Sequence, residues 1–226
     1  MTWEAGSYGR TGSVERKSER PNRQGDASRE AILEAALEIA AERGYDGTTV
    51  AAVTERSGLP ASSIYWHFGS KDALLTAAME YSYREWRRNA PMWRPRRQES
   101  DDPTERIETW FQRAVKHLTR NPHFWRMGLI LTLERRVKEP EARRLFFRLR
   151  QESEDAMVEW WRDVLAGTGL DRSEEELRGI ARFHFMLMDG MYIQYRANAA
   201  RIPTRQVSLI ARALAARVLK QASPCG

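Results

Sequence analysis

The sequence predicts an all-α protein of about nine helices, with a small three-helix head near the N-terminus and a larger helical domain after it. From Ser28 onward apolar residues recur at helical spacing, and no stretch alternates apolar and polar residues for long enough to form a strand. Glycine and proline interrupt the pattern where helices are expected to end. We therefore expect a flexible arm over residues 1–26, the head over 27–75 and the larger domain over 76–226.

The composition is typical of a folded cytoplasmic protein. The chain has 226 residues, of which 42% are hydrophobic, so it can bury a core of ordinary size. Its one cysteine, Cys225, allows no intramolecular disulfide and favours a reducing compartment. The sequence has neither a signal peptide nor a run of about 18 apolar residues, so we expect no contact with a membrane.

The net charge of +6 is not evidence for nucleic-acid binding. Residues 27–83, which include the whole head, carry four basic and eight acidic side chains and so have a net charge of −4. Any contact of the head with DNA must therefore depend on the position of individual side chains.

The first helix is expected over Arg29–Arg43, with Ser28 or Asp26 as its N-cap and Gly44 as its stop. Its apolar residues line one face. Because carboxylates repel phosphate, the opposite, acidic face should point into solvent and away from DNA. This acidic stripe consists of Glu30, Glu34, Glu38 and Glu42.

A helix-turn-helix is expected next. One short helix begins at the Thr48-Thr49 cap and ends at Ser57, and a second spans Ala61–Phe68. The turn between them needs a positive φ, which suits Gly58. In such a unit the second helix lies in the major groove of DNA. The following helix begins after Ser70 and runs through Glu80 towards Asn89.

The second of these short helices has two distinct sides. Ile64 and Phe68 are four residues apart and mark the buried side, together with Val53 and Leu59 of the neighbouring elements. The other side presents small hydroxyls, which allow close approach to base edges, and aromatic groups, which can donate to phosphate or pack on a thymine methyl. Residues at the starts of the flanking helices add N-terminal phosphate sites. The predicted DNA-binding residues are Thr48, Thr49, Ser62, Ser63, Tyr65, Trp66, His67 and Lys71.

The segment from Arg29 to Met79 resembles the TetR family of regulators. The resemblance rests on REAILEAA from Arg29, RGYDGTTV from Arg43, SGL from Ser57, IYWHF from Ile64 and SKDALL from Ser70. It implies a transcriptional regulator, usually a repressor, that binds a pseudo-palindromic operator in double-stranded DNA as a homodimer and is released by a small-molecule effector. It also implies that Thr49, Tyr65, His67 and Lys71 contact the DNA backbone and that residues 61–63 and 66 face the bases or adjoining phosphates.

The resemblance further implies an effector pocket among the helices of the larger domain, which are expected at Pro103–Arg120, Pro122–Val137, Glu141–Ala166 and Ser173–Ala200. Eight tryptophans and eight methionines in the chain suit a hydrophobic or aromatic effector. A packed core explains the same apolar residues, so both interpretations stay open. The candidate pocket residues are Trp110, Phe124, Trp125, Met127, Phe147, Trp161, His184 and Met188.

The helix over Ser173–Ala200 is apolar on more than one side, so it lies deep in a core or also meets a second subunit. The last helix, Thr204–Gln221, adds small residues that allow close helix approach. We therefore expect a four-helix dimer interface, in agreement with the family. Asp189, in these apolar surroundings, needs a partner such as Arg182 or Arg196. The expected interface residues are Phe185, Met188, Tyr192, Ala211, Leu214, Ala215 and Val218.

Other classes of protein fit less well. The histidines at positions 67, 117, 123 and 184 lack metal-ligand spacing, and the sequence contains neither a glycine-rich phosphate loop after a strand nor a nucleophile elbow. We expect no catalytic residue, metal or cofactor. The main alternative is a dimeric ligand-binding or protein-interaction module that has lost specific DNA binding, because Pro60 and Ala61 replace polar residues usual in the family. The basic segment Arg84–Arg97 is expected to be a solvated connector, with DNA flanks and anionic lipid as alternatives.

Overall fold

The computed structural model describes residues 23–93, 100–120, 122–134, 140–198 and 202–220. Over these ranges it contains nine α-helices, one short 3-10 helix and no strand, so the all-α prediction is confirmed. The helices are α1 (Arg23–Gly47), α2 (Val50–Ser57), α3 (Ala61–Phe68), α4 (Lys71–Asn89), α5 (Pro103–Arg120), α6 (His123–Leu133), α7 (Glu141–Leu165), α8 (Glu174–Asn198) and α9 (Thr204–Val218), and the 3-10 turn is Pro91–Trp93.

The predicted bounds of α2, α3 and α4 are confirmed. The Thr49 hydroxyl accepts from the backbone N–H of Ala52 at 3.1 Å and caps α2, and the Ser70 hydroxyl caps α4 through Ala73 at the same distance. Gly58 has φ 70°, the left-handed conformation that the turn was expected to need. These ends are fixed by local chemistry, which explains why the sequence alone locates them.

The start of α1 was predicted wrongly. This helix begins at Arg23, so residues 23–26 of the expected arm are helical, while residues 1–22 lie outside the described ranges. Gly44, expected to end the helix, instead interrupts it with φ 73°, and helical structure continues to Gly47. Neither Asp26 nor Ser28 is the N-cap, and the Ser28 hydroxyl donates to the carbonyl of Gln24 at 2.9 Å within the helix.

The later helices agree with the predicted pattern and differ at their ends. Helix α5 has the predicted bounds, and α7 ends one residue early because Ala166 leaves the helical conformation. Helices α6, α8 and α9 end at Leu133, Asn198 and Val218. The longer ends expected for these three helices fall partly on residues outside the described ranges, as do residues 94–97 of the basic segment.

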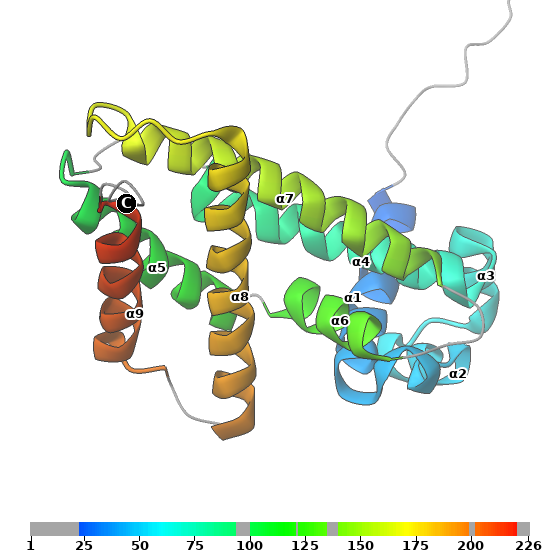
Figure 1. The fold of residues 1–226 in the computed structure, drawn as a ribbon. Helices are drawn as coiled ribbons and strands as arrows, with labels where there is room; N and C mark the ends of the chain where they lie inside the picture. The colour runs from blue at the N-terminus through cyan, green and yellow to red at the C-terminus, as the bar shows by residue number, and fades with distance from the viewer. Residues whose placement is uncertain (1–22, 94–99, 121, 135–139, 199–201, 221–226) are drawn as a thin grey trace, which may run out of the picture.

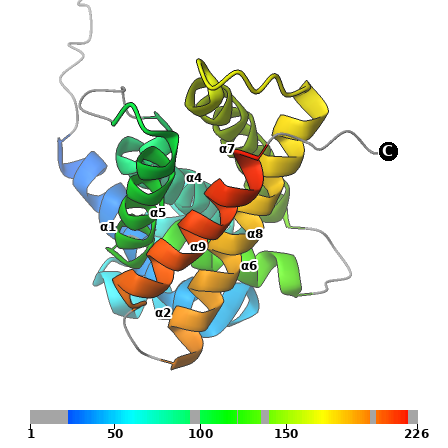
Figure 2. The same cartoon turned by 60° about the vertical axis from the view of Figure 1, so that its left-hand side comes forward.

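The helices form two regions that share α4. Helices α2 and α3 lie at one end of the molecule, and α5, α8 and α9 lie at the other (Figure 1). Helix α4 packs against α1 on the side of the head and against α7 on the side of the larger domain. In the second region α9 packs on α5, and α8 packs on α7 (Figure 2). Through the described parts of the chain, no helix combines the length and the apolar character that a bilayer crossing requires.

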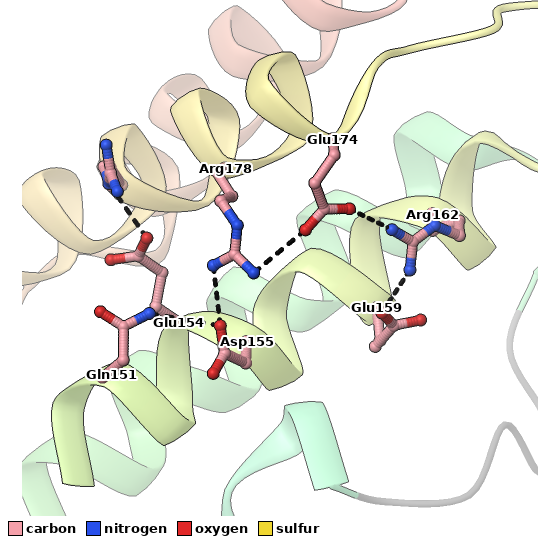
Figure 3. A network of polar contacts seen from close by, with 8 residues as sticks. Gln151, Glu154, Asp155, Glu159, Arg162, Glu174 and Arg178 are labelled. Carbon is pink, nitrogen blue, oxygen red and sulfur yellow. Dashed lines mark hydrogen bonds and ion pairs between the residues drawn. The ribbon is translucent and has the colours of Figure 1, made fainter. Parts of the chain in front are cut away.

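Ion pairs join α7 to α8 along their exposed edge. Arg178 pairs with Asp155 at 2.7 Å and with Glu174 at 3.0 Å, and Arg162 reaches Glu174 at 2.6 Å (Figure 3). Such exposed pairs are screened by solvent, and each contributes little to stability. Arg178–Asp155 and Arg162–Glu174 link α7 to α8 along this edge.

The expected partner of Asp189 was wrong. Asp189 pairs with Arg150 of α7, with Oδ2 2.5 Å from the guanidinium, and Arg182 instead pairs with Glu154 at 3.0 Å. The pairing follows from the face of α8 on which Asp189 lies, because that face packs against α7. Burial raises the pKa of Asp189, and Arg150 opposes this rise.

A glycine in α6 allows α6 and α7 to approach closely. A Cβ built on Gly128 would lie 2.0 Å from the ring of Phe146, a side chain that is itself fully buried. A methyl group therefore fits at this position only if the Phe146 ring or one of the two helices moves.

We predict that Gly128→Ala destabilises the protein. The overpacking should cost about 1–3 kcal/mol, which exceeds the gain of about 1 kcal/mol from the higher helix propensity of alanine. Urea unfolding measures the difference. Gly179→Ala in α8 is the matched control, since no described atom lies within 4 Å of its added Cβ, and it should leave the stability unchanged or raise it. Equal effects of the two substitutions would contradict this account of α6.

Candidate functional site

Helix α3 presents an aromatic and hydroxyl surface to solvent. Ile64 is 1% exposed and anchors the helix, whereas Tyr65 is 55% exposed and Trp66 is 76% exposed. Ser62 is exposed as well, and Ser63 is half-buried. The His67 ring packs edge-on against Trp66, with ring centroids 4.6 Å apart. The two-sided helix expected from the sequence is present.

The apolar contacts expected to hold α3 across α2 are also present. Val53 of α2 is fully buried, and Leu59 and Phe68 pack against the same core. The guanidinium of Arg29 lies 5.5 Å from the centre of the Phe68 ring. These contacts fix the buried side of α3 and thereby set the direction of its exposed side.

Two predicted phosphate-binding residues lie at the ends of neighbouring helices. Because the Thr49 hydroxyl accepts a bond as a cap, its own proton can still be donated. The Lys71 ammonium, in the first turn of α4, donates to the carbonyl of Asp46 at 3.2 Å and lies 4.9 Å from the centre of the Tyr45 ring. The lysine is therefore held against the end of α1, beside the start of α2.

Thr48 was wrongly assigned to the DNA-binding surface. Its side chain is fully buried, and its hydroxyl donates to the carbonyl of Gly44 at 2.8 Å. It therefore stabilises the bend at the end of α1 and is not accessible from outside. Threonine is common at helix caps and at phosphate sites, so the sequence did not separate the role of Thr48 from that of Thr49.

The acidic stripe of α1 does more than face solvent. Arg56 of α2 pairs with Glu38 at 2.8 Å and with Glu42 at 3.1 Å, and its guanidinium holds the pKa of Glu42 below the usual value. The Tyr81 hydroxyl of α4 donates to Glu30 at 2.7 Å. The Tyr81 hydroxyl also lies 3.4 Å from a carboxylate oxygen of Glu34, so all four stripe carboxylates join α1 to α2 or α4.

Sequence reasoning missed a polar bridge between the head and the larger domain. The Tyr45 hydroxyl donates to Asp72 Oδ1 at 2.7 Å, and the other oxygen of Asp72 accepts from the backbone N–H of Glu141 at 3.5 Å. Glu141 is the first residue of α7. The sequence does show Asp72 next to Lys71 in the first turn of α4. Its two partners, Tyr45 and Glu141, lie 27 and 69 residues away, so the sequence alone does not reveal the bridge.

Most of the candidate pocket residues lie together in the core of the larger domain. Trp110, Trp125 and Met188 line a small cavity of about 20 Å³, and Phe124, Met127, Trp161 and His184 are buried in the same core. A cavity of this size holds roughly one water molecule. Phe147 was wrongly included, since it is 41% exposed and lies under the guanidinium of Arg143 at 4.8 Å.

His184 is the most unusual polar group of this core. Its side chain is fully buried, and neither ring nitrogen has a hydrogen-bond partner among the described residues. Burial alone lowers the pKa of His184 to about 3, so the imidazole is neutral at physiological pH.

The expected interface residues lie on the wrong sides of α8 and α9. All seven point into the protomer and are at most 5% exposed. The apolar side chains that α8 and α9 do expose are Phe183, Met186, Ile193 and Leu209, with exposed fractions of 47%, 63%, 53% and 69%. Next to them lies a groove of about 590 Å³, lined by residues that include Gly190, Tyr195, Ile202 and Ile210.

The histidines do not assemble a metal site. Across the described ranges, no group of three or more His, Cys, Asp or Glu side chains has a metal-binding arrangement. His117, for example, is buried in the aromatic core, where its Nε2 lies 2.8 Å from the carbonyl oxygen of Trp86.

Comparison with known proteins identifies relatives of the head. Residues 32–78 match the sequence profile described as bacterial regulatory proteins, tetR family. Over 52 residues the chain is 42% identical to the tetracycline repressor protein class C of Escherichia coli, a match that covers 23% of this chain and 24% of that repressor. The chain thus spans about a quarter of the length of these curated relatives.

The fold of the whole chain also has counterparts among solved structures. A TetR family transcriptional regulator from Agrobacterium tumefaciens superposes with a TM-score of 0.65 at 19% identity, covering 85% of this chain and 98% of that one. AibR, solved in complex with isovaleryl coenzyme A and operator DNA, gives a TM-score of 0.59 at 21% identity, with coverage of 84% and 97%. At these identities the likeness concerns the fold, which is that of transcriptional regulators.

We predict that His184 makes the stability depend on pH. Its folded-state pKa is lowered to about 3, so between about pH 6.5 and pH 3 the unfolded chain binds a proton that the folded chain does not. The stability is fully present above about pH 6.5 and falls with pH by up to about 1.4 kcal/mol per unit. Urea unfolding at pH 7, 6, 5 and 4 should give a shallower dependence for His184→Leu. Parallel curves for the two proteins would refute the prediction.

Proposed function

Residues 32–78 match the profile of the tetR family of bacterial regulatory proteins, and from this match we propose that the chain is a transcriptional repressor. It binds a pseudo-palindromic operator in double-stranded DNA as a homodimer, and a small-molecule effector releases it. The observation that carries the proposal is the exposed side of α3, where Trp66 is 76% exposed on a helix anchored by Ile64 at 1%. A large aromatic group held outward on a rigid helix indicates a binding surface.

In this proposal α3 enters the major groove. Ser62 and Ser63 approach base edges, and Trp66 packs against bases or adjoining phosphates. Tyr65 and His67 reach the backbone on either side of the groove. Thr49 and Lys71 add phosphate contacts at the starts of α2 and α4, where helix dipoles also favour an anion.

Because the head is negatively charged, its affinity for DNA must depend on individual side-chain contacts and on dimerisation. Residues 27–83 have a net charge of −4, so a single head has little general attraction for DNA. Two heads that bind half-sites about one helical turn apart, or slightly more, combine their contacts on one operator. The affinity should still fall with salt, since each phosphate contact releases counterions.

We predict that replacing Trp66 and Lys71 together with alanine weakens operator binding by about 30-fold or more, because two contacts of about 1 kcal/mol or more each are lost. Binding to a DNA fragment from upstream of the chain's own gene is measured by fluorescence anisotropy over a salt series. The matched control is Phe147→Ala with Lys116→Ala, which removes an exposed aromatic group and an exposed lysine outside the head. If the head variant stays folded and dimeric and binds as tightly as the control, the proposed contacts are wrong.

The exposed apolar side chains of α8 and α9 support the proposed dimer. Four large apolar side chains on two neighbouring helices, next to a groove of about 590 Å³, are costly to leave in water. A second copy of the same surface would cover them with four helices and a two-fold axis. We call the surface formed by Phe183, Met186, Ile193 and Leu209 the α8/α9 face.

We predict that Ile193→Glu combined with Leu209→Glu dissociates the dimer, since a carboxylate buried between two apolar surfaces is strongly disfavoured. Analytical ultracentrifugation at micromolar protein should show a monomer. Leu133→Glu is the matched control, because Leu133 is 76% exposed on α6 and lies outside the α8/α9 face. A doubly substituted protein that sediments as the unsubstituted protein does would exclude this face as the interface.

The effector is proposed to bind in the aromatic core of the larger domain. AibR, which shares this fold, has been solved with an acyl coenzyme A and with operator DNA, so one fold can serve both ligands in that protein. In this chain Trp110, Trp125 and Met188 surround the cavity of about 20 Å³. The cavity must widen to admit an effector, and the side chain of Met188 is flexible enough to take part in that change.

A second candidate function keeps the dimer and the pocket without specific DNA binding. The start of α3 favours it, because Pro60 is the N-cap and has no polar side chain, and the neighbouring Ala61 has none either. A footprint on the upstream fragment at low salt would exclude this function. The absence of any footprint, with an intact dimer, would establish it over the repressor.

A further inference from the structure

Five aromatic side chains from three helices meet at the centre of the larger domain. The His184 ring of α8 stacks on Phe111, with centroids 4.3 Å apart, and meets Trp110 edge-on at 4.1 Å. Trp161 and Trp160 of α7 lie further out, at 5.9 and 6.2 Å. We call Trp110, Phe111, Trp160, Trp161 and His184 the His184 cluster. Each member is at most 8% exposed.

The polar atoms of the His184 cluster lack hydrogen-bond partners among the described residues. These atoms are both ring nitrogens of His184 and the indole nitrogens of Trp110, Trp160 and Trp161. A neutral imidazole has one donor and one acceptor, so the cluster offers four N–H donors and one acceptor. In folded proteins the large majority of buried polar side-chain atoms are paired. The edge-on contact of His184 and Trp110 can supply one weak N–H to ring interaction, which leaves the other donors unmatched.

The charged groups that border the cluster pair with each other. Arg106, one turn before Trp110 on α5, binds Asp163 at 2.5 Å. Arg150 binds Asp189 at 2.5 Å, and its guanidinium lies 5.0 Å from the centre of the Phe185 ring. Both arginines are thus already paired with a carboxylate and offer no uncompensated positive charge to an anionic ligand. Burying an anion without a charge partner is strongly disfavoured, so the donors of the cluster suit a neutral acceptor.

The cluster adjoins a place in this core where space is already present. Trp110 belongs both to the cluster and to the lining of the cavity of about 20 Å³. Trp125, Phe185 and Met188 also line this cavity. A flat ligand that displaces the Met188 side chain would pack against these rings and extend past Trp110 towards the ring of His184, whose centroid lies 4.1 Å from that of Trp110.

We propose that the His184 cluster binds the polar end of a flat, uncharged organic molecule that carries a hydrogen-bond acceptor, such as a ketone or amide oxygen. His184 and one indole N–H of the cluster donate to the two lone pairs of this oxygen, and the neighbouring rings cover the apolar body. His184 is thus a specificity-determining residue. Only the role of this molecule as an effector rests on the proposed repressor function.

The probes that test the proposal are 1-indanone, a small flat ketone, and indane, the hydrocarbon of the same shape without the oxygen. Isothermal titration calorimetry with the full chain should show 1-indanone binding about fivefold or more tightly than indane, because a hydrogen bond to buried donors is gained. In a ¹⁵N-labelled protein, 1-indanone should shift the indole signals of Trp110, Trp160 and Trp161, while the signal of the exposed Trp66 stays unchanged.

His184→Leu, which is close in volume, should reduce the preference for 1-indanone over indane to about twofold or less while indane still binds. It should also leave the melting temperature unchanged or raise it, because a buried polar group without a partner is removed. Ser153→Ala is the matched control, since that buried hydroxyl has a hydrogen-bond partner at 2.8 Å and does not line the cavity, and it should keep the preference. His184→Gln, which retains a donor and an acceptor, should keep part of the preference and serves as the second variant if His184→Leu fails to fold.

Equal affinity of the unsubstituted protein for the two probes would overturn the proposal, as would a preference that persists in His184→Leu. It would also be overturned if 1-indanone at millimolar concentration left the three indole signals of the cluster unmoved. Binding to the upstream DNA fragment is measured on the same samples. A protein that discriminates between the probes and ignores DNA contradicts the repressor proposal alone, whereas one that binds DNA and does not discriminate contradicts the ligand proposal alone.

Discussion

Helix α4 carries one continuous hydrophobic core from the head into the larger domain, and the rest of the structure depends on this continuity. Its first half places Leu74, Leu75 and Met79 in the core of the head, all at most 1% exposed. Its second half places Tyr83 and Trp86 among the aromatic rings of the larger domain, where Trp86 lies 5.3 Å from Phe124 and 5.7 Å from Trp125. A helix buried at both ends cannot tilt without changing the packing of this core. The head and the larger domain therefore form one mechanical unit.

The polar bridge at the start of α4 adds a second connection. Asp72 binds Tyr45 at the end of α1 and the first N–H of α7, next to the lysine that is proposed to hold a phosphate. Helix α7 carries two members of the His184 cluster at its other end and is tied to α8 by Arg150 and Asp189. Contacts therefore run without a gap from the proposed effector site along α7 to Asp72, beside the proposed DNA surface.

Features that depend on contacts between residues close in the sequence could be predicted, and features that depend on contacts between distant residues could not. The bounds of α2, α3 and α4 could be predicted, because Thr49, Gly58 and Ser70 act within a few residues of their own position. The partner of Asp189 could not, since Arg150 lies 39 residues away on α7, whereas the expected partners Arg182 and Arg196 lie on α8 itself. The interface residues could not be predicted for a related reason. A helix that is apolar on two sides does not reveal which side meets its own core, and the side of Phe185, Met188 and Tyr192 is the buried one.

The contacts of α1 explain the net negative charge of the head. Glu38 and Glu42 are matched by Arg56, and Glu30 accepts from Tyr81, so much of the negative charge is committed to holding α1 against its neighbours. This arrangement commits the carboxylates of α1 to contacts with α2 and α4, and leaves the α3 surface itself to uncharged donors. A head with this charge contributes little long-range attraction to DNA. In the proposed repressor, the affinity would therefore come from placed contacts and from the spacing of two heads, and the packing of α4 and α7 would set that spacing.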